Sequence, residues 1–208
     1  MSGVKKLLLS GAILAAALTA CGYPTPGAPP SAKEILAKPQ QSNLKDAHFV
    51  VSGSLSNNGT SVKVTGDGAI DYKPKPAGRF KFVTTVGGQV VSFEQISVNN
   101  TDYGLQTPGA TKWVSKADTT GGIGPSVFAG ASAQKYIGEA DLPQGKAWHA
   151  SAKDSAGNPF DAYIRESDGY PIKYVETQTG GDSITLTFDK YDTGTAITPP
   201  PSAQVTPG

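Results

Sequence analysis

Apolar and polar residues alternate with a period of two along most of the chain after residue 47. In the segment FVVSGSL, Phe49, Val51 and Leu55 fall on one face of an extended chain. Short turn sequences such as Asn57-Asn58-Gly59 and Gly87-Gly88 separate the alternating segments. Such short loops join neighbouring strands, so the pattern predicts one large antiparallel sheet.

The second half of the chain repeats this pattern. We expect strands at about 137–141, 146–153, 160–166, 171–179 and 182–191. One irregularity lies earlier, where Val91 and Phe93 fall on one face but Ile96 and Val98 on the other. That switch predicts a β-bulge near Gln95.

Helical material is scarce. The segment Ser31-Ala-Lys-Glu34 has the spacing of a capping box and predicts a helix that Pro39 ends or kinks. The segment 125–137, with Pro125 at a first helical position, predicts one or two further helical turns. The fold class is therefore α+β and mostly β, with a curved sheet wrapped around two helical pieces.

The N-terminal residues have the order of a secretory signal peptide. Lys5 and Lys6 precede an uncharged apolar run over residues 7–17, which is too short to span a bilayer. The sequence Leu18-Thr-Ala-Cys21 then resembles the lipobox of bacterial lipoproteins. That resemblance implies cleavage before Cys21, transfer of a diacylglyceryl group to its thiol and acylation of the new amine. The alternative is an ordinary signal peptide, or an uncleaved anchor, with a cysteine there by chance.

These features divide the chain into four parts. We expect a signal peptide at residues 1–20, a lipidated Cys21 with a Pro/Gly-rich tether to residue 30, a folded domain at 31–197, and a disordered tail at 198–208. The domain would then be held at the extracytoplasmic side of a cell membrane by its lipid anchor.

Charge and cysteine content narrow the possible functions. The formal net charge is +1, and removal of Lys5 and Lys6 with the signal peptide lowers it to −1. This balance gives no basic surface for nucleic acid, so we expect no nucleic-acid partner. The single cysteine allows no internal disulfide, so stability must come from the core.

The sequence offers little that could catalyse a reaction or bind a metal. His48 and His149 are the only histidines, and no second cysteine or close histidine pair accompanies them. No Gly-x-Ser-x-Gly motif is present. Carboxylates such as Asp67 and Glu94 could pair in space, but strand and turn carboxylates are usually solvated. We expect no catalytic residues, no metal and no cofactor.

Spaced apolar and aromatic landmarks over residues 31–200 resemble a known group of proteins. They are HFVVSG from His48, FEQISV from Phe93, KWV from Lys112, GYPIKY from Gly169 and ITLTFDKY from Ile184. This order resembles the LppX/LprG-type lipoproteins and the wider LolA/LolB-like superfamily. The resemblance implies a LolA-like half-barrel of about eleven antiparallel strands with a few short helices over its concave face. It also implies an apolar cavity that holds acyl chains, and a role in binding or carrying a lipid or other amphiphile without chemistry.

The large apolar residues of the predicted sheet and helices are the candidate cavity walls, although an apolar sheet face is more often ordinary core than pocket. They are Phe49, Val51, Phe80, Phe82, Val91, Phe93, Trp113, Phe128, Tyr136, Trp148, Ile164, Ile172, Leu186 and Phe188. A lipid site predicts a continuous apolar void above about 300 Å³. We expect a monomer whose partners are this ligand and the membrane. The alternative is a non-enzymatic envelope scaffold or sensor lipoprotein that binds a protein partner.

Overall fold

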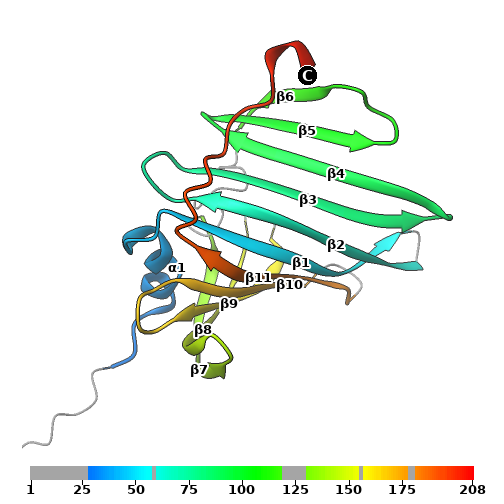
Figure 1. The fold of residues 1–208 in the computed structure, drawn as a ribbon. Coiled ribbons are helices and arrows are strands. Elements are labelled where there is room, and N and C mark those ends of the chain that lie inside the picture. The colour runs from blue at the N-terminus through cyan, green and yellow to red at the C-terminus, as the bar shows by residue number, and fades with distance from the viewer. Residues whose placement is uncertain (1–27, 58–59, 119–129, 155–156, 178–180) are drawn as a thin grey trace, which may run out of the picture.

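One open, curved sheet carries most of the chain (Figure 1). The computed structural model describes residues 28–57, 60–118, 130–154, 157–177 and 181–208. Within these residues twelve strands lie in the order β12-β6-β5-β4-β3-β2-β1-β11-β10-β9-β8-β7. The mostly β class is therefore confirmed, with twelve strands where about eleven were expected.

The elements alternate with short turns along the chain. They are α1 (Ala32–Gln41), β1 (Asp46–Asn57), β2 (Thr60–Asp71), β3 (Ala77–Val86), β4 (Gln89–Val98), β5 (Thr101–Thr107), β6 (Trp113–Ala117), β7 (Ser132–Leu142), β8 (Gly145–Lys153), β9 (Pro159–Arg165), β10 (Pro171–Thr177), β11 (Ser183–Tyr191), the 3₁₀-helix η1 (Ser202–Gln204) and β12 (Val205–Pro207).

Two meanders make the sheet and meet at its centre. Strands β1–β6 form the first and β7–β11 the second, and β11 joins them by pairing antiparallel with β1. Tight turns set the hairpins: Asn99 and Asn100 have φ of 53° and 58°, and Gly87 and Gly88 have φ of 58° and 81°. These left-handed conformations suit asparagine and glycine, as the sequence predicted.

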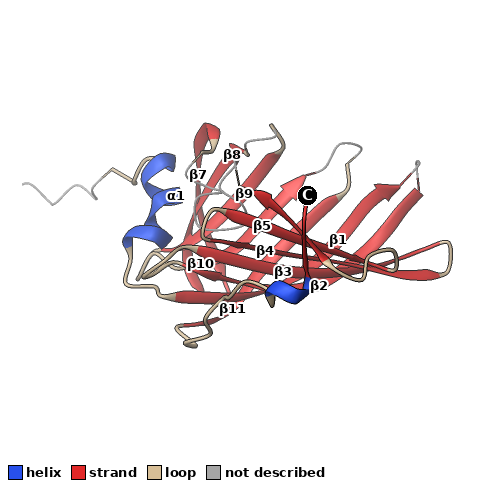
Figure 2. Cartoon of the chain, turned by 90° about the horizontal axis from the view of Figure 1, so that it is seen from above, coloured by secondary structure: helices blue, strands red, loops and turns tan. Residues whose placement is uncertain are grey.

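The sheet has a concave and a convex face. We call concave the face that carries Phe49, Val51, Phe80 and Phe82; the register places these side chains on the same side of β1 and β3. Figure 2 shows the sheet bending into a trough with α1 at one end. The main core lies on this face, where buried Phe49 and Phe188 pack with Ile35 of α1.

Helix α1 begins as the sequence predicted and closes one end of the trough. Its capping box is complete, with Ser31 Oγ accepting from Glu34 N and Glu34 Oε2 accepting from Ser31 N. Pro39 lies inside the helix, which ends two residues later. Its buried side chains include Ile35 and Leu36, and its contacts are with β7, β8 and β9.

The structure contradicts the second predicted helix over the residues of that segment that it describes. Residues 132–137 belong to β7, in which half-buried Gln134 and Tyr136 alternate with exposed Lys135 and Ile137. This period of two suits an edge strand. Of the rest of that prediction, residues 125–129 lie outside the described part, and Gly130 and Ala131 are not helical. Within the described residues, α1 is the only α-helix, where a few short helices were expected.

The predicted disorder of residues 198–208 is also wrong. After β11 the chain crosses the convex face, and β12 pairs in parallel with β6 (Figure 1). Ile197 is 7% exposed and packs with Ala69, Ala77 and Val98. We call residues 192–208 the C-terminal strap.

The strap also explains why no bulge occurs at Gln95. Strands β3 and β4 pair without a register shift from Ala77–Val98 to Val86–Gln89. Phe93 faces the trough, whereas Ile96 and Val98 face the convex side and pack in the cluster of Ile197. Both faces of β4 carry apolar side chains, one toward the trough and the other under the strap, so the predicted bulge is wrong.

Candidate functional site

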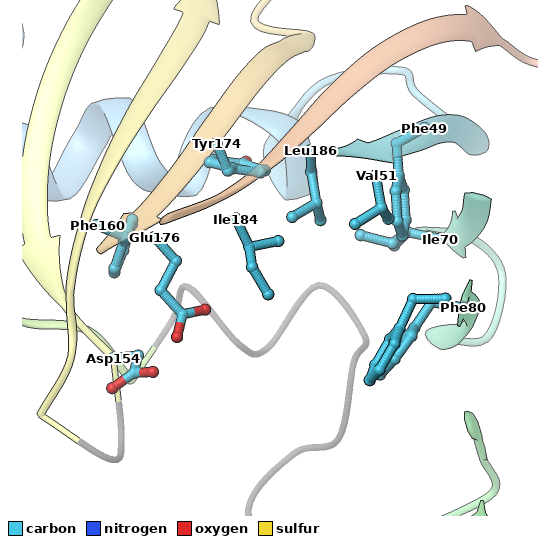
Figure 3. Close-up of a pocket in the computed structure, with 11 residues that line it drawn as sticks. Phe49, Val51, Ile70, Phe80, Asp154, Phe160, Tyr174, Glu176, Ile184 and Leu186 are labelled. Atoms are coloured by element: carbon cyan, nitrogen blue, oxygen red, sulfur yellow. The ribbon is translucent and has the colours of Figure 1, made fainter. Parts of the chain in front are cut away.

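An apolar cavity of about 210 Å³ lies on the concave face, between strands β1–β3 and strands β9–β11. Figure 3 shows its walls, with Phe80 at one end and Phe160 at the other. Its lining residues are Phe49, Val51, Ile70, Phe80, Phe82, Asp154, Phe160, Tyr174, Glu176, Ile184 and Leu186. Nine of these eleven residues are apolar or aromatic, so the cavity suits an alkyl chain.

The strand register produces this lining. Phe49 lies opposite Phe188 of β11 on one side and Gly68 of β2 on the other, and Gly68 lies opposite Phe80 of β3. Because Gly68 has no side chain, the sheet surface has space between the two phenylalanines. The Phe49 ring fills the space above Gly68, where an added Cβ would come within 2.3 Å of Phe49 Cζ.

The cavity floor is sealed toward α1 by packed rings. The Phe49 and Phe188 ring centroids are 5.4 Å apart, and Tyr174 meets Phe188 edge-on at 5.4 Å. Phe49 and Phe188 are almost fully buried, as is Leu44 in the segment after α1. A ligand therefore cannot pass toward α1 without displacing core residues.

Phe80 and Phe82 form the opposite wall, and Phe93 packs against both of them. Phe80 and Phe82 stack at 5.5 Å with an interplanar angle of 8°, and Phe93 lies 5.2 Å from Phe82 and 5.9 Å from Phe80. We call these residues the phenylalanine cluster. All three are half-buried, so their faces remain available for contact with apolar groups.

A second, more open hollow of about 470 Å³ lies on the same face beyond this cluster. It is lined by Phe93, Gln95, Asp102, Gly104, Leu105, Gln106, Ala110, Val114 and Lys116. Its polar side chains are linked: the Ser97 hydroxyl donates to Asp102 Oδ1 and accepts a 3.5 Å hydrogen bond from Gln95 Nε2. The phenylalanine cluster thus lies between the two hollows, with Phe80 and Phe82 lining the apolar one and Phe93 lining the mixed one.

Two carboxylates lie in the otherwise apolar cavity. Asp154 follows β8 and Glu176 lies on β10, and Asn158 Nδ2 donates to both, at 3.2 Å to Asp154 Oδ2 and 3.4 Å to Glu176 Oε1. Asn158 N also donates to Asp154 Oδ1 at 2.8 Å. All three side chains are half-buried. One amide therefore fixes both carboxylates at the same end of the cavity (Figure 3).

The predicted wall residues separate into several groups. Phe49, Val51, Phe80, Phe82 and Leu186 line the cavity, and Phe93 lines the second hollow. Of the remaining candidates, Ile164 and Phe188 are buried in the main core, and Tyr136 and Trp148 pack against it. Ile172 is buried outside that core cluster, and Val91 lies opposite Thr84 near the β3–β4 turn.

One described candidate, Trp113, does not face the trough. Val114 lines the second hollow on the concave face, so its neighbour Trp113 points to the convex side, where it lines a shallow hollow with Arg79 and Lys81. Phe128 lies outside the described residues.

Six lining residues did not appear among the candidates: Ile70, Asp154, Phe160, Tyr174, Glu176 and Ile184. Three of them were identifiable, because Phe160, Tyr174 and Ile184 each share a strand face with a candidate two or four residues away. Ile70 lies in an alternating segment that held no candidate. The two carboxylates gave no such signal, since their approach depends on the register of β9 and β10.

Burial perturbs three tyrosines beside the cavity. It raises the pKa of Tyr191 to about 12 and raises the pKa of Tyr72 and Tyr174 well above the ordinary value. The Tyr191 hydroxyl donates to the Pro171 carbonyl at 2.6 Å. These phenols stay protonated at neutral pH and contribute apolar ring surface to the core.

Each histidine lies within hydrogen-bond distance of an aspartate on the neighbouring strand. His48 Nδ1 lies 2.5 Å from Asp189 Oδ1, and His149 Nε2 lies 2.8 Å from Asp161 Oδ1.

Within the described ranges, no group of three or more histidine, cysteine or acidic residues could hold a metal ion. No helix in the described part of the chain is long and apolar enough to cross a membrane.

Comparison with known proteins identifies the fold. No family model and no curated protein matches the chain. An uncharacterized conserved protein from Thermus thermophilus matches with a TM-score of 0.54 at 16% identity, over 85% of this chain and 99% of that one. This level of identity shows a shared fold alone.

Two further solved structures have lower scores. LprF from Mycobacterium bovis has a TM-score of 0.46 at 13% identity, covering 81% of this chain and 96% of its own. A LolA superfamily protein from Nitrosomonas europaea has a TM-score of 0.37 at 7% identity, covering 84% and 97%. Both TM-scores lie below 0.5, so the evidence for a shared fold is the Thermus thermophilus match.

Proposed function

We propose that this protein binds one alkyl chain of a lipid or other amphiphile in the cavity of the concave face, without chemistry. The apolar lining of that cavity carries the proposal. Its 210 Å³ falls below the void of well above about 300 Å³ that a lipid site predicted. A single chain segment therefore suits it better than a lipid with several chains.

The second hollow gives the remainder of such a ligand a place to lie. It offers about 470 Å³ beyond Phe93 and is lined by polar as well as apolar groups. A chain that leaves the cavity across the phenylalanine cluster would enter it directly. About ten buried methylenes supply about 8 kcal/mol before association costs, so apolar walls suffice to hold a chain.

The proposed anchor would keep this site near a membrane. We propose that residues 1–20 are removed as a signal peptide and that Cys21 carries the lipid, on the extracytoplasmic side. Residues 21–31 connect Cys21 to α1 and extend at most about 40 Å. The domain, proposed to be a monomer, would therefore exchange amphiphiles locally.

Ligand uptake by the chain from Gly22 onward tests this proposal, because every described element is kept. The purified chain is analysed by native mass spectrometry and then titrated with a fluorescent fatty acid. Ile184→Trp fills the cavity, whereas Thr185→Trp places the same ring on the convex face of the same strand. We expect the first variant to lose at least about tenfold in affinity and the second to change little.

Apo mass alone, together with no uptake by the unsubstituted chain, would refute the proposal. A protein that co-purifies with such an empty chain would favour the scaffold or sensor alternative. Circular dichroism of both variants verifies that the sheet is retained.

A further inference from the structure

The polar end of the cavity indicates which class of head group the ligand has. The walls are apolar except for Asp154 and Glu176. Figure 3 places both carboxylates at the end marked by Phe160, away from Phe80. An occupant whose chain lies along Phe80 and Ile184 would have its head beside these two acids.

The two carboxylates are held in place. A short turn after β8 fixes Asp154, because Asp154 N donates to the Asn158 carbonyl at 2.9 Å and Gly157 N donates to the Asp154 carbonyl at 3.1 Å. Asn158 Nδ2 then bridges Asp154 and Glu176. An ionised carboxylate has about four acceptor positions, so the two hydrogen bonds from Asn158 leave room on Asp154 for a ligand donor.

The charge at this end is negative. Among the described residues, no lysine or arginine forms an ion pair with Asp154. Apolar walls screen charges less than water does, so the two carboxylates act strongly on a head group placed beside them. A phosphate or carboxylate head would be repelled, and a neutral head would gain hydrogen bonds only.

We propose that the cavity selects an amphiphile with an ammonium head, which donates to Asp154 and Glu176 while its chain lies on the phenylalanine side. This inference rests on the proposed function and specifies its ligand class. A primary ammonium has three donors and no acceptor, which matches two fixed acceptors that lie close together.

Competition among amphiphiles of one chain length tests this selection. Dodecylamine, dodecanoate and dodecanol displace Nile red, a neutral probe, from the chain beginning at Gly22. We expect dodecylamine to bind about tenfold or more tightly than dodecanoate at neutral pH, with dodecanol between them. In the double variant Asp154→Asn/Glu176→Gln, the three competitors should bind with similar affinities, and the affinity for dodecanol should be unchanged.

A control variant of equal charge change separates local from general electrostatics. Asp67→Asn/Glu94→Gln removes two carboxylates that line the hollow on the convex face. We expect it to retain the preference for dodecylamine. Equal loss in both double variants would show that net charge alone sets the preference, and would overturn the inference.

The outcomes distinguish the two proposals. If Nile red and dodecanol do not bind, the proposed function itself fails. If they bind but dodecylamine gains nothing over dodecanoate, the function stands and the head-group inference is wrong.

An ammonium head could belong to an aminolipid or to an acylated peptide. Lysophosphatidylethanolamine and Nε-dodecanoyl-lysine amide, as further competitors, separate these sources by which one binds more tightly. Binding of both no tighter than that of dodecanoate would again overturn the inference.

Discussion

The ring of Phe49 occupies the space in which any other residue at position 68 would place its side chain. Phe49 and Gly68 lie opposite each other on β1 and β2. A Cβ on Gly68 would lie 2.3 Å from Phe49 Cζ and 2.6 Å from the Arg79 carbonyl oxygen. Because Phe49 is 1% exposed and lines the cavity, this pair joins the stability of the sheet to the shape of the site.

Gly68→Ala is therefore expected to destabilise the protein by about 1–3 kcal/mol, because the ring or the neighbouring strand must move. Gly104→Ala is the matched control, since Gly104 also lies in a strand on the concave face but a Cβ there would meet nothing within 4 Å. The control should be neutral or stabilise by up to about 1 kcal/mol. Urea unfolding measures both, and equal effects would contradict the account of Phe49.

The sheet was predictable because alternation and turn residues are local signals. Phe49 and Val51 share a face, Gly87-Gly88 and Asn99-Asn100 turn the chain, and Ser31 caps α1 as expected. The strap was missed because its prolines and small residues carry no period. Its order comes from distant partners, such as the cluster around Ile197 and the pairing of β12 with β6.

The cavity was predictable only in part, for a similar reason. Alternation shows that Phe82 and Leu186 face the trough, but it does not distinguish a cavity wall from packed core. Phe188 has the same pattern and is fully buried, because Phe49 and Tyr174 pack against it. The approach of Asp154 to Glu176 depends on the registers of β8, β9 and β10, which no local signal specifies.

Ile197→Ala tests whether the strap stabilises the sheet. Ile197 is 7% exposed, and its side chain packs on Ala69, Ala77 and Val98. We expect a loss of about 2 kcal/mol in unfolding free energy and faster hydrogen exchange in β12. Thr198→Ala, which changes an exposed neighbour, should alter neither. An unchanged exchange rate in Ile197→Ala would show that the strap is held by other contacts.

Asp46 predicts how the strap responds to acid. Burial alone would raise the pKa of Asp46. Hydrogen bonds from the Thr193 hydroxyl, Gly194 N and Thr193 N outweigh it, so the pKa lies below its ordinary value of 3.8. The carboxylate therefore contributes stability that is present above pH 3.8 and is lost as pH falls through the lowered pKa.

Asp46→Asn should thus lower the free energy of unfolding by about 2 kcal/mol at neutral pH. The difference in unfolding free energy between this variant and the unsubstituted protein should become smaller as the solution becomes acidic. Asp71→Asn provides the contrast. Burial raises the pKa of Asp71, so its charge opposes folding at neutral pH and its removal should not destabilise. Unfolding curves over a pH series measure both variants. A difference for Asp46→Asn that stays constant into acid would exclude this role of the carboxylate.

Tyr191 and Tyr72 predict the alkaline limit of stability. Burial raises the pKa of Tyr191 to about 12 and that of Tyr72 still further, whereas the unfolded chain ionises near the ordinary value of 10.0. Both phenols contribute stability that is complete below pH 10 and is lost as pH rises through the raised values.

Tyr191→Phe removes the hydrogen bond to Pro171 and should lower the unfolding free energy by about 1 kcal/mol at neutral pH. Tyr72→Phe should cost nothing there, because its hydroxyl has no hydrogen-bond partner among the described residues. Each variant lacks one phenol whose ionisation favours unfolding, so alkali should destabilise it less than it destabilises the unsubstituted protein. Each should therefore unfold at a higher pH than its stability at neutral pH implies. Phenolate absorbance during alkaline titration measures this, and ionisation of either tyrosine before unfolding would contradict its burial.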